Sequence, residues 1–194
     1  MMNRQLEQLL RNKKWVDEQG GWEGAQQLDT LLSDVQRPRF EWLKANVTGT
    51  ILEVGCGWGY TLAYCRGHAG VDINPNLIEL ATLLAPHRAF TAGDARNLPV
   101  PANCFDTVTL PDVLEHLDWN DVPKAISEAV RVAKKRVLIT IPDGRKDTEE
   151  AQCFKHKFLF GDKERRKLRH QLIPLVSNYY QQAVGLFVCL RGDL

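Results

Sequence analysis

The residues with the clearest chemical meaning are one acid and three glycines in the segment ILEVGCGWG, residues 51–59. Glu53 precedes Gly55, Gly57 and Gly59, which alternate directly after an apolar run typical of a buried strand. Glycine has no Cβ, so it allows a positive φ and lets the main chain approach a ligand closely. A helix that begins after the glycines would add unpaired N–H donors. The segment therefore predicts a ligand-binding turn between a strand and a helix.

The acid restricts the ligand that this turn can bind. The dinucleotide-binding pattern is GxGxxG, whereas the third glycine here comes one residue earlier. A carboxylate at Glu53, at the end of the strand, repels a pyrophosphate but suits a ligand with a cationic amino acid group. S-adenosylmethionine is such a ligand.

With the acids downstream, the segment resembles the first motif of class I S-adenosylmethionine-dependent methyltransferases, hydrophobic-[DE]xGxGxG. Asp72 ends the next predicted strand, where the resemblance implies an acid that accepts both ribose hydroxyls. Asp94, in TAGDARNLP, resembles the acid that accepts the adenine amino group. The strand FDTVTL resembles the family's fourth motif, whose end lines the methionine side of the cofactor. The resemblance implies cofactor contacts from Glu53, Gly55, Cys56, Gly57, Gly59, Asp72, Ile73, Asp94, Ala95 and Leu110.

Each feature alone has a simpler explanation. GxGxG can be a tight strand-to-helix turn, and an aspartate after a strand is often a helix cap. Cys56 is expected to be a small spacer rather than a nucleophile, and Trp58 either packs on the cofactor or covers the edge of the sheet. The motifs favour the family because four of them occur in its order and spacing.

The resemblance implies S-adenosyl-L-methionine as cofactor and S-adenosyl-L-homocysteine as product. Methyl transfer from a sulfonium needs alignment and exclusion of water, so no metal is required. The aspartate-rich magnesium site of catechol-type members is not found, and no metal is expected. A hydroxyl acceptor would need a base, for which the candidates are His116 in LEHL and His156 in FKHKFLF. Asp112 in LPDV either orients an acceptor amine or caps the following helix.

These histidines also have structural alternatives, since His116 could simply form local hydrogen bonds at the start of a helix. The remaining three, His68, His87 and His170, are at the edges of predicted elements and are expected to face solvent.

The expected acceptor is an oxygen or nitrogen of a small-molecule metabolite. The segment LPDV departs from the [ND]PPY tetrad of nucleobase amino-methylating members, and no cysteine follows a proline as in cytosine-C5 enzymes. The basic run KERRKLRH, residues 163–170, is either a solvated face or a grip on phosphates, without interleaved aromatics for base stacking. Nucleic acid is therefore not favoured. An RNA or protein methyltransferase and a noncatalytic cofactor-binding partner subunit are kept as alternatives.

The elements that must position these residues alternate along the chain. Apolar patterning predicts strands at 50–54, 69–73, 87–93, 105–110 and 136–141, and helices at 59–67, 75–85 and 121–135. Such alternation predicts parallel βαβ units covered on both faces. A charged helix at about 161–171 precedes two apolar runs that flank Gln181 and Gln182 and predict a closing antiparallel pair. The fold class is an α/β, Rossmann-like doubly wound seven-stranded sheet, mostly parallel with a C-terminal antiparallel strand.

Length and composition favour one domain. A chain of 194 residues with 44% hydrophobic content can bury one sizeable core. We divide it into an N-terminal helical lid at 1–46 and a cofactor-binding domain at 47–194. The lid contains Trp15, Trp22 and Trp42, and it either covers the acceptor site or simply caps the core. The net charge of +1 gives no overall basic field.

The expected location is cytoplasmic. The five cysteines are scattered without a CxxC pair, which fits reduced thiols. The N-terminus is charged and lacks the apolar centre of a signal peptide, and no apolar run reaches the ~18 residues of a membrane span. No membrane partner is expected, and the sequence carries no signal for the oligomeric state.

Overall fold

A computed structural model describes residues 37–142, 161–184 and 187–194, with side chains described up to residue 182 and again from residue 190. The helices are α4 (Arg37–Asn46), α5 (Tyr60–Tyr64), α6 (Pro75–Leu84), α7 (Val122–Val132) and α9 (Asp162–Leu172), with short 3-10 helices η1 (Leu114–His116) and η2 (Ile173–Leu175). The strands are β1 (Ile51–Val54), β2 (Ala69–Asp72), β3 (Ala89–Ala92), β4 (Phe105–Pro111), β5 (Ala133–Pro142), β6 (Asn178–Val184) and β7 (Phe187–Asp193).

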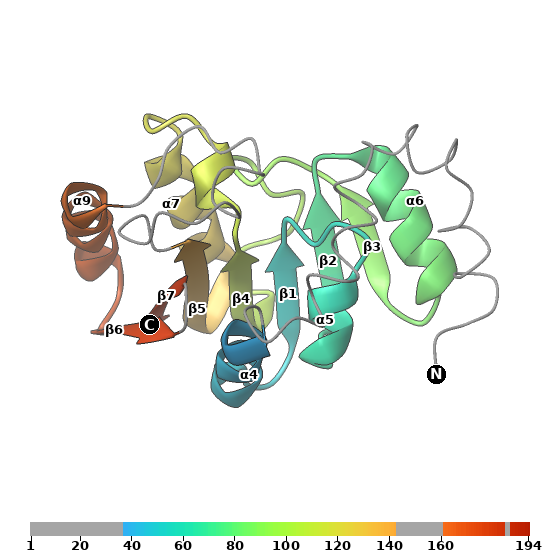
Figure 1. The fold of residues 1–194 in the computed structure, drawn as a ribbon. Helices are drawn as coiled ribbons and strands as arrows, with labels where there is room; N and C mark the ends of the chain where they lie inside the picture. Colours follow the sequence, from blue (N-terminus) through green and yellow to red (C-terminus); the bar gives the residue numbers. More distant parts are fainter. Residues whose placement is uncertain (1–36, 143–160, 185–186) are drawn as a thin grey trace.

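All seven strands form one sheet in the order β3-β2-β1-β4-β5-β7-β6. The first five strands are parallel, and β7 runs antiparallel to both β5 and β6. This confirms the predicted fold class. Because β1 pairs with β2 on one side and β4 on the other, the segments that follow these three strands meet at one edge of the sheet, toward which their arrowheads point in Figure 1.

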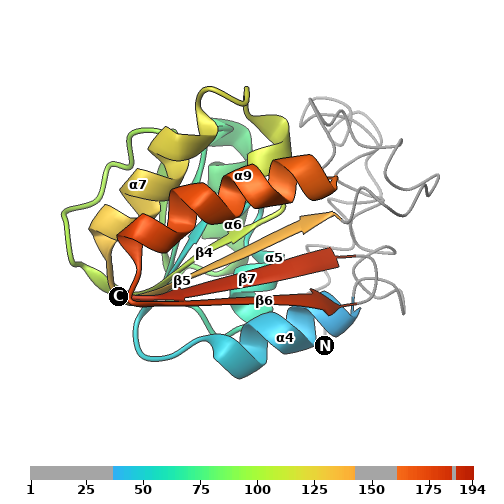
Figure 2. The same cartoon turned by 90° about the vertical axis from the view of Figure 1, so that its left-hand side faces the viewer.

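Helices cover both faces of the sheet. Figure 2 shows α7 and α9 on one face and α4 on the other. The larger core cluster joins the α7 and α9 face to strand residues such as Leu52, Val54, Val108 and Leu110. The second cluster joins α4 to the opposite face through Phe40, Leu43, Cys65 and Leu138. Coverage on both faces explains why β1 and most of β4 are buried at consecutive residues rather than at alternate ones, including the polar Glu53, Thr107 and Thr109.

Two details of the predicted elements were wrong. The closing antiparallel pair is confirmed as β6 and β7, but Gln181 and Gln182 lie inside β6, which pairs with β7 up to Val184, and not between the two strands. Strand β5 begins at Ala133, so Lys134 and Lys135 lie on a strand and not at a helix end. Strand pairing with β4 and β7 outweighs the helical pattern of these charged residues.

The described part of the predicted lid is a helix packed on the sheet. Phe40 and Leu43 of α4 are fully buried, and the Asn46 carbonyl accepts a hydrogen bond from Arg136 at 2.6 Å. Trp15, Trp22 and the rest of residues 1–36 lie outside the described residues. The division at residue 46 stays a prediction.

None of the helices in the described ranges combines the length and the apolar character that a membrane crossing requires.

Candidate functional site

The glycine segment forms a turn between β1 and α5. Gly55, Gly57 and Gly59 all have positive φ, at 71°, 51° and 85°. The N–H groups of Gly55 and Cys56 both donate to the Val71 carbonyl of the neighbouring strand, at 2.7 and 3.1 Å. The turn is therefore anchored to β2 and leads directly into the N-terminus of α5, as the sequence predicted.

Gly55 and Gly57 have different surroundings. A Cβ built on Gly55 would lie 2.4 Å from Cγ2 of Val113, so this glycine is required by packing inside the protein. A Cβ built on Gly57 would meet no described atom within 4 Å. Among the described residues, packing does not require a glycine at position 57, although the positive φ favours one. The open space beside Gly57 could therefore hold a ligand.

Asp72 holds this turn from the neighbouring strand end. Its carboxylate oxygens accept hydrogen bonds from the N–H of Gly57 at 2.8 Å and of Asn74 at 2.9 Å. The side chain that caps α6 is Asn74, which accepts from the Asn76 N–H at 3.0 Å. Asp72 is therefore not the helix cap, and its carboxylate is placed beside Gly57 as a ribose-binding acid would be.

The residue after Asp72 is an exposed apolar side chain. Ile73 is 69% exposed, although it directly follows the interior strand β2. An exposed isoleucine next to the glycine turn offers an apolar surface to a flat ring such as a nucleobase. This location is compatible with the cofactor contact expected for Ile73.

Glu53 is buried on the face of the sheet that α4 covers. Its neighbours Leu52 and Val54 point into the core on the α7 side, so the alternation of a strand directs Glu53 to the opposite face. Only 3% of Glu53 is exposed. Burial raises its pKa well above the usual value, the positive charge of Arg39 lowers it in part, and the negative charge of Asp72 raises it further.

Asp112 is held by two partners at the end of β4. Its carboxylate forms an ion pair with Arg39 of α4 and accepts a hydrogen bond from Thr140 Oγ1 at 3.0 Å. Its backbone has a φ of 53°, a strained value for a residue with a side chain, and its N–H donates to the Thr140 carbonyl at 2.9 Å. Asp112 is thus positioned at the site, but its carboxylate is already engaged.

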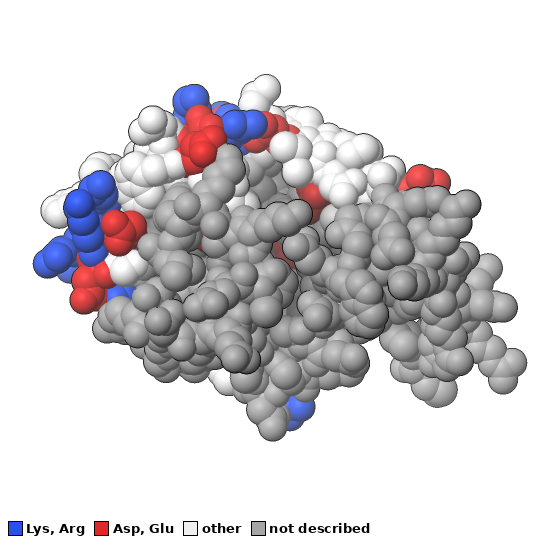
Figure 3. Space-filling view, turned by 45° about the horizontal axis from the view of Figure 1, so that its top comes forward, with Lys and Arg blue, Asp and Glu red and all other residues white. Residues whose placement is uncertain are grey.

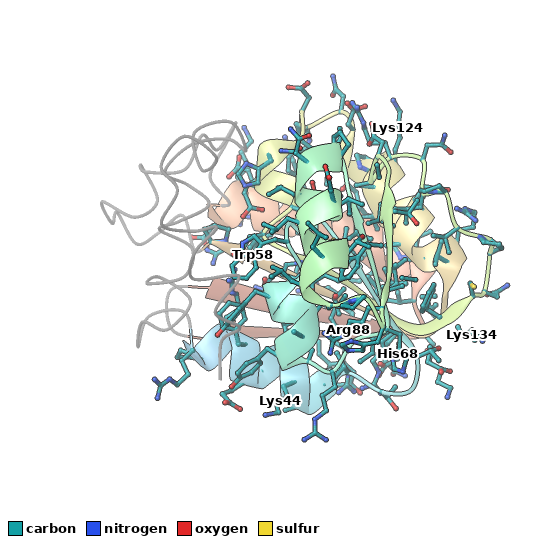
Figure 4. All side chains as sticks on the ribbon, turned by 90° about the vertical axis from the view of Figure 1, so that its right-hand side faces the viewer. Lys44, Trp58, His68, Arg88, Lys124 and Lys134 are labelled. Carbon is teal, nitrogen blue, oxygen red and sulfur yellow. The ribbon has the colours of Figure 1, made fainter. Side chains whose placement is uncertain are left out.

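The predicted histidines lie in different environments. His116 ends η1 and is exposed, whereas His156 lies outside the described residues. His68, His87 and His170 are exposed, as predicted. In Figure 4 His68 lies away from Trp58, which belongs to the glycine turn after β1. The described histidine that stays a candidate for acceptor chemistry is therefore His116.

Glu115 is a residue that sequence reasoning missed. It is fully buried in η1, and neither of its carboxylate oxygens has a hydrogen-bond partner among the described residues. Burial raises its pKa to about 8, while its own amide and the charge of Arg39 lower it only in part. In the sequence Glu115 stands between Leu114 and His116 and carries no signal of burial other than the apolar residues around it.

Asp94 is tied to its own loop. Its carboxylate accepts from Arg96 Nε at 2.9 Å and from the Arg96 N–H at 2.8 Å, and these bonds lower its pKa. Arg96 also pairs with Asp121 at 2.8 Å. Ala95 packs against the main core. Asp94 is therefore ionised and fixed after β3, in the place expected for an adenine-binding acid.

Three other predicted contacts involve mostly buried side chains. Leu110 is fully buried in the core, so only its main chain could reach a ligand. Cys56 is buried, and burial raises the pKa of its thiol, which agrees with its expected role as a spacer. Trp58 is buried with its ring 5.6 Å from that of Tyr60.

The basic run lies on α9, where Figure 3 shows Lys and Arg side chains gathered with acids among them. Arg165 is buried and pairs with Asp162. The Lys167 ammonium lies 5.3 Å from the centre of the Trp119 ring, and the Arg169 guanidinium 5.9 Å from that of Tyr179. Aromatics do therefore lie beside this run, but they come from other segments, which the sequence pattern could not show.

No cluster of three or more His, Cys, Asp and Glu side chains that could hold a metal ion occurs within the described ranges.

Comparisons with known proteins agree with this geometry. Residues 52–141, just under half of the chain, match the family model of the methyltransferase domain. A solved structure from Thermotoga maritima, described as an S-adenosylmethionine-dependent methyltransferase and possible histamine N-methyltransferase, is similar with a TM-score of 0.66 and 22% identity over 81% of this chain and 88% of that one. Residues 52–141 are therefore similar to a methyltransferase domain, and the chain has the fold of the class I S-adenosylmethionine-dependent methyltransferases.

Curated relatives match over a shorter stretch. The uncharacterized methyltransferase YcgJ of Bacillus subtilis is 32% identical over 94 residues, which are 44% of this chain and 36% of that protein. Ajmaline N-methyltransferase of Rauvolfia serpentina is 34% identical over 105 residues, which are 47% of this chain and 34% of that protein. The chain thus spans about a third of the length of these relatives.

The different surroundings of Gly55 and Gly57 predict unequal effects of the same substitution. Gly55→Ala and Gly57→Ala share the strain of a side chain at positive φ, about 1–2 kcal/mol. Gly55→Ala must also displace Val113, which should add about 1–3 kcal/mol of overpacking. Chemical denaturation of both variants should therefore show the larger loss of stability in Gly55→Ala. Equal losses would contradict the packing role of Gly55.

The burial of Glu115 predicts a pH-dependent stability. An acid with a higher pKa in the folded chain binds more protons there, so the wild type should lose stability as pH rises from about 4.5 to about 8. Glu115→Gln cannot ionise, and its advantage over the wild type should grow across this range to the order of a few kcal/mol. Denaturation midpoints against pH measure the difference.

The matched control for Glu115 is Glu79→Gln, which neutralises an exposed acid on α6. It should leave the pH dependence unchanged. If Glu115→Gln destabilises the protein most at high pH, then Glu115 is ionised and stabilised by Arg39.

Proposed function

We propose that this protein is an S-adenosylmethionine-dependent methyltransferase that transfers a methyl group to a nitrogen or oxygen of a small molecule. One observation carries the proposal: the carboxylate of Asp72 holds the N–H of Gly57 at 2.8 Å, and no described atom occupies the space beside that glycine. The backbone of Gly57 is therefore accessible to a ligand at the edge of the sheet where β1, β2 and β4 end.

The residues around this turn fit the cofactor. Asp72 has lone pairs left for ribose hydroxyls, since each of its oxygens accepts one hydrogen bond from the backbone of the turn or of Asn74. Ile73 provides an apolar surface, and the ionised Asp94 can accept from an amino group. Glu53 would bind the ammonium of the amino acid end. The different groups of one ligand are thus matched along one edge of the sheet.

Bound S-adenosylmethionine would supply an electrophilic methyl group on a sulfonium. The protein's part is then to align an acceptor lone pair with that methyl carbon and to exclude water. Asp112 is anchored by Arg39 and Thr140, so it is suited to orienting an acceptor rather than to taking up its proton. His116 is exposed at the end of η1 and is the candidate base among the described histidines.

A nitrogen acceptor has the stronger support. The Rauvolfia relative is an N-methyltransferase, and the Thermotoga structure is described as a possible one. An amine needs only its lone pair, and the described site contains acids that suit a basic substrate. Phosphate-bearing substrates are less well supported, because Arg165, Lys167 and Arg169 of α9 already have partners inside the protein.

Two measurements test the function. Calorimetry should detect binding of S-adenosylhomocysteine, and no binding at ~1 mM would refute the cofactor assignment, since it corresponds to less than about 4 kcal/mol. A screen of amines and hydroxyl compounds for S-adenosylhomocysteine production should then identify the acceptor class. Tight binding without turnover on any acceptor would favour a noncatalytic partner subunit, and turnover on RNA or protein alone would favour those substrates.

Asp72→Ala should weaken cofactor binding by about 1.5–3 kcal/mol, because it removes a charged acceptor from the ribose and from the Gly57 N–H. Calorimetric titration measures the loss. Glu79→Ala on the exposed side of α6 removes the same charge and should bind as the wild type does. A dissociation constant for Asp72→Ala within about twofold of the wild type would show that the cofactor is held elsewhere.

If the acceptor is a hydroxyl, removing the base should reduce turnover about a hundredfold or more. We expect this for whichever of His116→Ala and His156→Ala faces the methyl group, with little change in cofactor affinity. His170→Ala, on the exposed side of α9, is the control. For an amine the loss should be smaller and should shrink as pH rises. Full single-turnover rates in both variants at every pH would leave neither histidine as the base.

A further inference from the structure

A buried arginine lies among the acids of the proposed site. Arg39 is only 5% exposed, on the first turns of α4, and forms an ion pair with Asp112. Asp112 lies three residues beyond Thr109, which is the register partner of Glu53 in the neighbouring strand. Arg39 therefore reaches the carboxyl edge of the sheet at the point where β1 and β4 end together.

Glu53 points toward the same helix. The alternation of β1 directs Leu52 and Val54 to the α7 side and Glu53 to the side that α4 covers. A buried guanidinium and a buried carboxylate thus lie on one face of the sheet, where low dielectric makes the interaction between charges strong. Both groups would be very unfavourable there without a partner of opposite charge.

Acids outnumber the cation at this place. The charged and titratable groups around Glu53 and Arg39 come from α4, the strand ends, η1 and the two cysteine positions, and they are Arg39, Asp72, Asp112, Glu115, Cys56 and Cys65. Arg39 interacts with three of these acids, because it pairs with Asp112 and its charge acts on Glu53 and Glu115. Asp72 acts on Glu53, and the exposed Lys44 and Glu41 of α4 act on Cys65. Without Arg39, repulsion and burial would both favour protonated acids.

We infer that Arg39 is a positioning residue for the cofactor: its guanidinium, fixed by Asp112 on the face of the sheet that Glu53 shares, favours the carboxylate form of Glu53 that meets the ligand's ammonium group. The inference rests on the proposed function, because it concerns the same cofactor site. Arg39 itself need not touch the ligand. A protonated Glu53 would offer only a neutral hydrogen bond to the ammonium, which is weaker than a charge-assisted one.

The role predicts a pH-dependent loss of affinity. In Arg39→Met the pKa of Glu53 rises further, so binding of S-adenosylhomocysteine should weaken about tenfold or more at the acidic end of the pH range in which the protein is folded. Affinity should recover as pH rises, because Glu53 then loses its proton in the free protein as well. The ratio of variant to wild-type affinity is the quantity to plot, since the ligand's own titration cancels in it.

Matched variants separate charge from structure. Arg39→Lys keeps the charge and should restore most of the affinity and the wild-type pH profile. Lys44→Met removes a charge from an exposed position of the same helix and should have no effect. Glu53→Gln should bind weakly with a flat ratio across pH, and Arg39→Met added to it should lower affinity no further.

Several results would overturn the inference. Wild-type affinity in Arg39→Met at every pH would do so, and so would a loss of equal size at every pH, which indicates a structural role. If Arg39→Met does not fold, Arg39→Gln replaces it in the experiment, because glutamine keeps a hydrogen-bond donor for Asp112 without the charge. Failure of both variants to fold would likewise assign Arg39 a structural role alone. A wild-type protein that does not bind the ligand would instead refute the proposed function.

Discussion

The parallel pairing of β1 with β2 and β4 places the central part of the candidate site. Parallel strands end at the same edge, so Glu53, the glycine turn, Asp72 and Asp112 come together although they are spread over some 60 residues of sequence. The same pairing supplies the Val71 carbonyl that accepts from the N–H groups of Gly55 and Cys56. A change in register would therefore move the acids and the turn together. Ligand sites of open α/β sheets lie at this edge for the same reason.

Placing acids at a covered sheet edge has an electrostatic consequence. Glu53 and Glu115 are buried among apolar side chains, and burial raises the pKa of both. A binding site for a cationic ligand needs such acids ionised, whereas stability of the free protein favours their protonation. Arg39 lowers the pKa of both residues. The packing of α4 on the sheet thus affects the charge of the site as well as the core.

The three glycines show how one motif serves two purposes. Gly55 is closely packed against Val113, whereas Gly57 faces open space. Both have a positive φ, so the turn itself requires them, but only Gly57 has surroundings that a ligand could fill. Asp72 links this glycine to the next strand and so joins the shape of the turn to the acid expected to bind ribose.

The sequence by itself determined the alternation of strands and helices, the glycine turn and the acids at the strand ends. These are local signals: apolar periodicity, residues without a Cβ, and spacing along the chain. It could not predict that Arg39 reaches Asp112, because that contact joins segments far apart in the chain, nor that Glu115 is buried while His116, its neighbour, is exposed. It also placed Gln181 and Gln182 between the last two strands, whereas both residues lie inside β6 and pair with β7. Only the tertiary structure decided these features, because burial and the contacts between distant segments depend on how the covered sheet packs and not on local residue preference.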